Sequence, residues 1–352
     1  MHLHEIFSRI VQYGHEVTLL CSSFPSAKRV EVIDGIKVLR VGKRYNFNFC
    51  VPMVIKRLLR KKRYDVVVDD INKIPFFTPL YIKHIPILAI LHHLFGRSIY
   101  RELNPILATY VRLSEKLIPL VYRNVVFSVV SESTKNELVK LGIPEKNVFI
   151  IYNGIPKELK PDPLKKSATP LILLYGRVKR YKCPEFCLYA MKKVIAHIPD
   201  VKLVVMGTGD YLPALMRLSQ KLQLHEHVEF LGYVPEDEKL KVLQSSWVMV
   251  NTSSREGWGI SVIEGNACGV PIIASDSPGL RDAVVHGKTG FLVKHGDIEE
   301  LAQKIILILK DKQLREKLSQ NALEWASQFD WERAARETLD LIEYTISKSR
   351  SN

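Results

Sequence analysis

The chain has 352 residues, of which 47% are hydrophobic and 25% charged, and its formal net charge is +14. This length suits two domains, and this composition excludes a disordered, collagen-like or disulfide-rich protein. Residues 1–150 hold 23 basic and 12 acidic side chains, against 28 and 25 in the remainder, so the N-terminal half carries most of the positive charge. The excess predicts an anionic partner there: phosphate, a membrane surface or nucleic acid.

The sequence shows no targeting or membrane-spanning segment. No apolar run approaches the roughly 20 residues of a membrane helix, and His2, Glu5 and Arg9 are unlike a secretory signal. The chain has five cysteines, an odd number, and none of them forms a CxxC motif, so we expect them to be reduced thiols. We therefore expect a cytoplasmic protein.

The first half alternates helical and strand-like segments. A helix is predicted over residues 2–13, and Gly14 is expected to end it. Strand-length apolar runs and helical patterns then follow in turn: strands at 16–21, 37–41, 65–68, 85–91, 124–130 and 148–152, and helices at 51–63, 99–122 and 133–141. Such alternation is typical of parallel sheets. Because a doubly wound domain normally opens with a strand and a Gly-rich turn, we expect this one to lack its first strand and that loop.

A second alternation follows a linker. Residues 155–170 contain four prolines and little apolar periodicity, as expected between domains. Six more strands are predicted, at 171–175, 201–206, 228–231, 248–251, 271–274 and 291–293, before helical residues 298–347. The fold class is therefore α/β, with two doubly wound Rossmann-like domains at 1–154 and 171–330 that face a central cleft. Residues 331–352 are predicted to form a helix that packs back on the first domain.

The strongest motif candidate lies in residues 254–264, which read as strand, Gly-rich loop and helix. Glu256 is expected on the loop and Glu264 on the helix. Gly257 and Gly259 allow a ligand to approach the backbone, and the amides from Ile260 onward attract anions. Two carboxylates that flank such a turn could hold the sugars of a nucleotide-sugar. A helix that merely begins with glutamates is the competing interpretation.

Three shorter motifs follow other strands of the second half. Basic residues follow the strand at 171–175, and Arg177 and Lys182 are better placed than their neighbours to stabilise a departing diphosphate, although a solvated loop would look the same. The Gly-x-Gly of residues 207–209 lacks the third glycine of an NAD fingerprint. Residues 230–234 either border a base or belong to the core.

In the first half, one histidine pair and one basic tract are notable. His92 and His93 end an apolar strand, and one of them could carry a proton or contact a sugar, although such a pair more often has a structural role. No metal-ligand spacing occurs, so no metal is expected. Residues 56–63 hold six basic side chains that could face anionic lipid or simply end a helix. No nucleic-acid recognition motif accompanies the charge.

Together these motifs resemble the family 4 retaining glycosyltransferases of the GT-B fold, over residues 2–335. The most specific likeness is the E-x7-E pattern from Glu256 to Glu264 within REGWGISVIEGNACGVPIIASD. Further likenesses are the GR…K from Gly176 to Lys182, the GYV at 232–234, and the segments GLRDAVVHGKTGFLV, GHEVTLL, VSESTKNEL and YNGI. Cys183 stands where a glycine commonly follows the motif lysine.

The resemblance implies a role for each candidate residue. Glu264 would bind the ribose, and Glu256 and His92 would be catalytic residues at the transferred sugar. The diphosphate would be held by Arg177, Lys182, Gly257, Gly259 and Ile260, and the base would be bordered by Phe230, Gly232, Tyr233 and Val234. No cofactor is implied beyond a UDP- or GDP-sugar donor, and transfer would retain the anomeric configuration without a metal.

The resemblance also implies partners and leaves alternatives open. The acceptor would be a glycan, a lipid-linked molecule or another compound bound by domain 1–154, and the positive charge there could bring the protein to the cytoplasmic membrane face. A nucleotide-sugar epimerase of the same fold is one rival interpretation. A catalytically inactive, N-terminally truncated nucleotide-sugar-binding fragment is the other.

Overall fold

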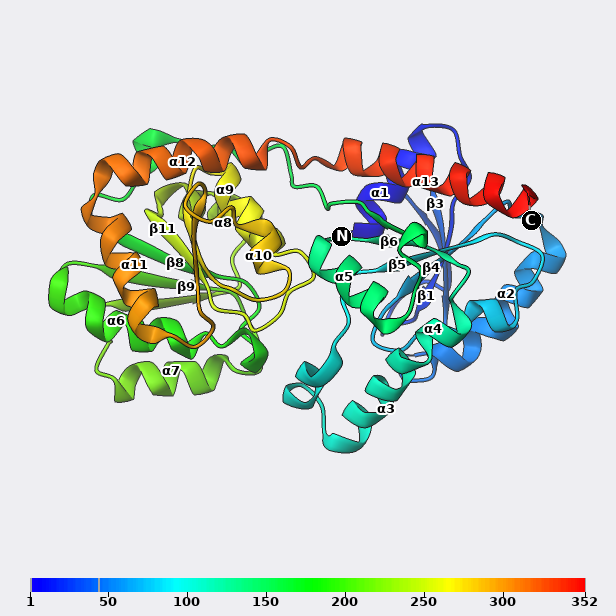
Figure 1. Cartoon of the computed structure of the whole chain (residues 1–352), viewed down its shortest axis with the longest axis horizontal. Coiled ribbons are helices and arrows are strands. Elements are labelled where there is room, and N and C mark those ends of the chain that lie inside the picture. Colours follow the sequence, from blue (N-terminus) through cyan, green and yellow to red (C-terminus); the bar gives the residue numbers. More distant parts are fainter. Residues whose placement is uncertain (1, 44, 352) are drawn as a thin grey trace. The chain divides into compact units, whose positions relative to one another are not determined.

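The computed structural model describes residues 2–43 and 45–351, which form two compact units. Unit 1 comprises Met1–Gly154 and Trp331–Asn352, and unit 2 comprises Ile155–Asp330. Each unit is an α/β structure in which helices cover a mainly parallel sheet (Figure 1). The chain is thus an α/β protein with two Rossmann-like units, as the alternating pattern predicts.

The core of unit 1 is a four-stranded parallel sheet in the order β4-β5-β6-β7. Its strands are β4 (Val67–Ile71), β5 (Ile87–Leu91), β6 (Val126–Val129) and β7 (Val148–Ile150). All five residues of β5 are buried, because helices cover this central strand. The helices and turns of unit 1 are α1 (His2–Gln12), α2 (Phe47–Lys61), η1 (Thr78–Leu80), η2 (Gly96–Arg101), α3 (Pro105–Lys116), α4 (Ile118–Val121), α5 (Glu132–Leu141), η3 (Glu145–Asn147) and α13 (Trp331–Ser351).

The last helix of the chain belongs to unit 1. Helix α13 packs along α1 and against β5 and β6. Phe149 at the end of the sheet contacts Tyr344 of α13, and Lys348 donates a hydrogen bond to Asn147 at 2.7 Å. Residues more than 190 positions apart in sequence therefore complete one core.

The remaining strands of unit 1 form a second sheet, in the order β1-β3-β2, with one antiparallel pair. They are β1 (Thr18–Ser22), β2 (Val30–Ile33) and β3 (Ile36–Val41). The purely parallel expectation was wrong here, because β2 and β3 form a hairpin. Asp34 and Gly35 make its two-residue turn with φ of 47° and 81°, the positive values that an Asp-Gly hairpin turn requires.

Two expected helices are divided. The helix expected over 99–122 is interrupted after η2, since Asn104 caps α3 through the amide of Leu107 and Pro105 begins it. The helical end of the chain is three helices, because the Asp311 side chain caps the second of them and residues 327–330 form a break. Among the described residues, no helix is both long enough and apolar enough to cross a bilayer.

Unit 2 contains one six-stranded sheet, parallel throughout, in the order β10-β9-β8-β11-β12-β13. Its strands are β8 (Leu171–Tyr175), β9 (Lys202–Met206), β10 (Val228–Gly232), β11 (Val248–Asn251), β12 (Ile272–Ser275) and β13 (Gly290–Val293). Its helices and turns are η4 (Pro163–Lys165), η5 (Arg180–Lys182), α6 (Glu185–His197), α7 (Leu212–Lys221), α8 (Glu236–Ser245), α9 (Ile260–Ala267), α10 (Leu280–Ala283), α11 (Ile298–Lys310) and α12 (Lys312–Ala326). The strand order reverses between β8 and β11, and in such sheets ligands bind beyond the carboxyl ends at this point.

Two layers of helices cover that sheet. Helices α6, α7 and α11 share one apolar cluster with the strands, while α8 and α9 pack on β8, β11 and β12, and α12 packs on α9 (Figure 1). Helix α9 lies close to the sheet because Gly265 faces it. A Cβ at this position would lie 2.9 Å from Met249 Sδ and 3.1 Å from Ile272 Cδ1. This close approach brings the neighbouring Glu264 down to the carboxyl ends of the strands.

Candidate active site

Most of the predicted site residues follow strands at the carboxyl edge of the unit 2 sheet. Arg177 and Lys182 come after β8, Gly232 is the last residue of β10, and Glu256 comes after β11. The loops pack closely: a Cβ on Gly207 would lie 2.0 Å from the Gly176 carbonyl oxygen. Glycine is therefore needed here for backbone packing, whatever ligand the loops bind.

The centre of this edge is an ion pair between Lys182 and Glu256. Lys182 Nζ lies 2.7 Å from Glu256 Oε1, and the two side chains are only 16% and 15% exposed. The Ser253 hydroxyl donates to the same carboxylate oxygen at 2.7 Å. Burial acts to lower the pKa of Lys182, but the Glu256 carboxylate outweighs it and the pKa lies above its ordinary value. Lys182 is therefore a cation at neutral pH.

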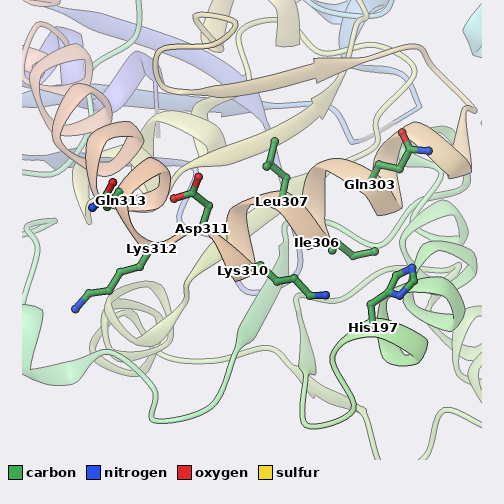
Figure 2. A pocket seen from close by; sticks show the side chains of 8 residues that line it. All are labelled: His197, Gln303, Ile306, Leu307, Lys310, Asp311, Lys312 and Gln313. Carbon is green, nitrogen blue, oxygen red and sulfur yellow. The ribbon is translucent and has the colours of Figure 1, made fainter.

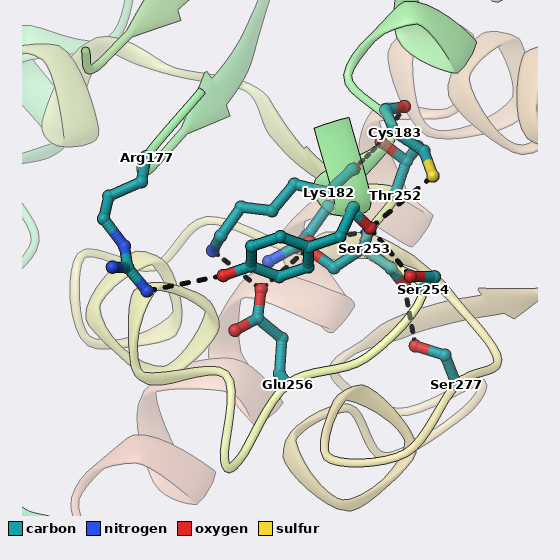
Figure 3. A network of polar contacts seen from close by, with 10 residues as sticks. Arg177, Lys182, Cys183, Thr252, Ser253, Ser254, Glu256 and Ser277 are labelled. Carbon is teal, nitrogen blue, oxygen red and sulfur yellow. Dashed lines mark hydrogen bonds and ion pairs between the residues drawn. The ribbon is translucent and has the colours of Figure 1, made fainter. Parts of the chain in front are cut away.

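Hydrogen bonds to the backbone hold this pair in place (Figure 3). Thr252 Oγ1 donates to the carbonyls of Lys182 and Cys183, at 3.1 and 2.8 Å. Ser254 donates to the carbonyl of Tyr181 at 2.8 Å. The loop after β11 is thus joined to the turn η5, which carries the lysine, and this pre-organises the pair.

Cys183 has a positive φ of 49°, in the left-handed region that favours glycine. A glycine, which the resemblance leads us to expect here, would adopt this conformation at little steric cost. Its Sγ lies 4.0 Å from His295 Nε2, and His295 Nδ1 lies 3.1 Å from the Ser275 hydroxyl.

The loop that carries Glu256 ends at the first turn of α9. Gly259 precedes the helix with φ of 70°, and Glu256 donates its amide to the Pro278 carbonyl at 2.9 Å. A Cβ on Gly279 would lie 2.3 Å from the Glu256 carbonyl oxygen. As the spacing predicts, Glu256 lies on the loop and Glu264 on the helix. Gly257 and Ile260 flank the helix start, where amides are available to an anion.

Glu264 is nearly buried, with a second lysine beside it. The residue is 3% exposed, and Lys239 Nζ lies 3.4 Å from its Oε1. Burial raises the pKa of Glu264, while Lys239 and a hydrogen bond from Tyr175 oppose that rise. Lys239 also pairs with the exposed Glu236.

Sequence reasoning missed both partners of Glu264. Lys239 lies 25 positions away on α8, within a run of alternating charges that is typical of a solvated helix face. Tyr175 was assigned only to a strand. Neither residue carries a local signal, because the fold alone brings them to Glu264.

The other predicted residues of unit 2 are placed less centrally. Arg177 is exposed and contacts the Tyr181 hydroxyl at 3.4 Å. Phe230 packs against the apolar core, whereas Gly232 has φ of 66° and Tyr233 is 81% exposed. Val234 follows on the loop to α8. Gly232 to Val234 therefore remain available at the edge, and Phe230 has a packing role.

His92 lies in unit 1, immediately after β5. Its Nε2 is 3.2 Å from Asp70 Oδ1 at the end of the neighbouring β4, and its ring contacts that of His2 edge-on. Burial and the neighbouring His92 lower the pKa of His2 to about 3. His93 instead contacts Phe95. His92 is thus held by a carboxylate at the end of the neighbouring strand.

A cavity of about 720 Å³ lies elsewhere in unit 2. Figure 2 shows that residues of α11, of the α12 start and His197 line it. Because α6 runs back from the carboxyl end of β8, its last residue His197 lies at the opposite edge of the sheet. None of the predicted site residues lines this cavity, so we do not assign the site to it. In the described part of the chain, no group of three His, Cys, Asp or Glu is placed to hold a metal ion.

Comparison with known proteins identifies the family. The family model described as "Glycosyl transferases group 1" matches residues 156–325, and that described as "Glycosyltransferase Family 4" matches residues 1–159. The chain is 26% identical to N-acetyl-alpha-D-glucosaminyl L-malate synthase of Bacillus anthracis, over 92% of this chain and 80% of that protein.

Solved structures share the fold. Sucrose-phosphate synthase from Thermosynechococcus elongatus superposes with a TM-score of 0.82 at 21% identity, over 98% of this chain and 93% of that one. Anabaena HepE, solved in complex with UDP and glucose, gives 0.73 at 20% identity, over 88% and 86%. The two family matches together extend from residue 1 to residue 325, and the chain belongs to the group 1, family 4 glycosyltransferases with the GT-B fold.

Proposed function

We propose that the protein transfers a sugar, with retention of configuration and without a metal ion, from a UDP- or GDP-sugar to a glycan or lipid-linked acceptor. The observation that supports this most is the largely buried pair of Lys182 and Glu256 (16% and 15% exposed) beside the first turn of α9, with Glu264 on that helix. Among its relatives by fold, Anabaena HepE is solved with UDP-glucose.

The charges at this edge suit a nucleotide-sugar. Glu264 would accept hydrogen bonds from the ribose hydroxyls, and Glu256 would accept them from the transferred sugar. Lys182 and Arg177 would stabilise the diphosphate as it gains charge, together with the amides of the α9 first turn. Without donor, Lys182 is neutralised by Glu256. When donor is bound, the ammonium group of Lys182 has three protons and can donate hydrogen bonds to the Glu256 carboxylate and to a phosphate oxygen at the same time.

The transfer we propose proceeds on one face of the sugar. The bond between the anomeric carbon and the diphosphate breaks, the acceptor oxygen bonds to the same face, and the leaving phosphate takes the acceptor's proton. His92 would contact the donor sugar, with Asp70 positioning its ring. Charges then balance without an enzyme nucleophile: a nucleoside diphosphate leaves and the acceptor gains the sugar.

The test is an assay of the purified chain with UDP- and GDP-sugars and candidate acceptors in the presence of EDTA. We expect release of nucleoside diphosphate that depends on the acceptor, and a product whose proton NMR coupling shows the donor's anomeric configuration. Glu256→Gln should reduce turnover at least about 100-fold, whereas Glu299→Gln, which removes a carboxylate from the exposed Lys193 pair, should not. Inversion of configuration would contradict the mechanism, epimerised donor would indicate the rival enzyme, and binding without turnover would indicate an inactive protein.

A further inference from the structure

A stripe of apolar side chains faces solvent along helices α3 and α4 of unit 1. Ile106 and Leu120 are 82% and 79% exposed, and about half of each of the other members is exposed. The stripe, called the α3–α4 stripe below, comprises Ile106, Tyr110, Leu113, Leu117 and Leu120.

Helical geometry makes this stripe continuous. At 100° per residue, Ile106, Tyr110, Leu113, Leu117 and Leu120 lie within an arc of about 80°. Leu117 joins the two helices with helical φ and ψ of −82° and −12°, so the arc is not interrupted there. The opposite side holds the buried residues Ala108, Val111, Ser114, Glu115 and Ile118. The segment therefore has one apolar face toward the core and a second toward solvent, where a surface helix is normally polar.

The surroundings of the stripe are cationic. Residues 72–131 contain only two acidic residues, Glu102 and Glu115. Glu102 pairs with Lys73 at 2.8 Å, and the Glu115 carboxylate accepts from the amides of Phe95 and Gly96. Both carboxylates are thus engaged within the unit. Besides Lys73, the same segment contains six basic residues: Lys83, Arg97, Arg101, Arg112, Lys116 and Arg123.

We propose that the α3–α4 stripe docks on the surface of an anionic lipid bilayer. A helix that combines an apolar face with a cationic border is typical of segments that lie in the membrane interface, with the apolar side chains among the acyl chains and the basic ones near the headgroups. A second copy of the chain fits less well, because a twofold contact would bring two cationic borders together.

This surface deepens the proposed function and rests on it for the choice of acceptor. The segment that leaves β5 carries His92, continues through η2 and enters α3. Docking of α3 would therefore hold the His92 end of the unit 1 sheet near the bilayer. Of the acceptors considered, a lipid-linked one is the class that a docked enzyme would meet there.

The basic tract of residues 56–63 on and after α2 is a separate surface, and the experiment must distinguish the two. Vesicles of phosphatidylglycerol and phosphatidylcholine are sedimented with the wild-type protein and with Ile106→Asp/Leu120→Asp. A matched control, Leu164→Asp, changes a leucine that is 97% exposed in unit 2. A further variant, Arg60→Glu/Lys61→Glu, changes the basic tract.

We expect the wild type to bind anionic vesicles more tightly than vesicles of phosphatidylcholine alone. The stripe variant should lose at least tenfold in its partition coefficient, and Leu164→Asp less than twofold. Titration with UDP- and GDP-sugars on the same preparations checks folding, because the stripe variant should bind donor as the wild type does. That titration also separates failure of the docking proposal from failure of the proposed function.

Three results would overturn the inference. One is a folded wild-type protein that binds no anionic vesicle. Another is full vesicle binding by the stripe variant together with loss of binding by Arg60→Glu/Lys61→Glu, which would assign docking to the basic tract. The third is a wild-type dimer that the stripe variant converts to a monomer while vesicle binding is unchanged, which would make the stripe a self-association surface.

Discussion

Replacing Glu256 by glutamine is expected to destabilise unit 2 as well as impair the reaction. Lys182 Nζ and Glu256 Oε1 are 2.7 Å apart, and about 15% of each side chain is exposed. Removing one member of a fully buried pair costs about 3–5 kcal/mol, whereas exposed pairs contribute about 0–1 kcal/mol. Since the glutamine oxygen still accepts hydrogen bonds, we expect a loss of about 2 kcal/mol in the free energy of unfolding.

A double-mutant cycle isolates the pair. Urea unfolding is measured for wild type, Glu256→Gln, Lys182→Met and the double variant by tryptophan fluorescence. Three of the four tryptophans, Trp247, Trp258 and Trp325, report on unit 2. The double variant should be more stable than the sum of the single losses predicts, by about 1–2 kcal/mol, because it no longer buries an unpaired charge. Single losses that add within about 0.5 kcal/mol would refute the coupling.

Three further predictions concern other buried groups. Burial raises the pKa of Asp69 from 3.8 to about 6, although hydrogen bonds from Thr78 and Tyr122 act to lower it. Between these two pH values the folded state keeps a proton that the unfolded state releases. The contribution of Asp69 to the free energy of unfolding therefore falls as the pH rises from about 4 to about 6. Unfolding measured between pH 4 and 7 should show Asp69→Asn gaining about 2–3 kcal/mol on the wild type across that window, and a constant difference would contradict the assignment. Asn266 is fully buried on α9 and neither side-chain amide atom has a hydrogen-bond partner; Asn266→Leu should raise the free energy of unfolding by about 1 kcal/mol in urea, and a loss would show that the amide is satisfied. Gly279→Ala places a Cβ against the Glu256 carbonyl at a φ of 80°, so calorimetric titration should show donor affinity reduced at least about tenfold, and unchanged affinity would mean that the loop tolerates the shift.

The sequence predicted those features that depend on local patterns. Apolar runs bounded by turn residues placed most strands, and the glycines before α9 separated the loop glutamate from the helical one. The β2–β3 hairpin was missed although Asp34-Gly35 is a strong turn signal, because the alternation of strands and helices dominated the interpretation. Strand β4 was placed at 65–68 instead of Val67–Ile71, because Asp69 and Asp70 look unlike strand interior.

Features that depend on tertiary contacts could not be predicted in the same way. The pairing of Lys182 with Glu256 joins residues 74 positions apart, and that of Lys239 with Glu264 joins two helices. Both pairings depend on burial that the sequence does not show: Lys239, for example, has the sequence context of a surface residue but is only 5% exposed. Such pairs appear only when strand order brings the loops to one edge of the sheet.

The central claim is that the carboxyl edge of unit 2 binds a nucleotide-sugar through Glu264, and calorimetric titration with UDP- and GDP-sugars tests it most directly. Glu264→Gln is compared with Glu236→Gln, which removes the exposed carboxylate that pairs with the same Lys239. We predict that the wild type binds one donor class, that Glu264→Gln weakens this binding at least about tenfold, and that Glu236→Gln changes it less than about twofold. A folded wild-type protein that binds neither donor class, or a Glu264→Gln variant that binds as tightly as wild type, would contradict the account.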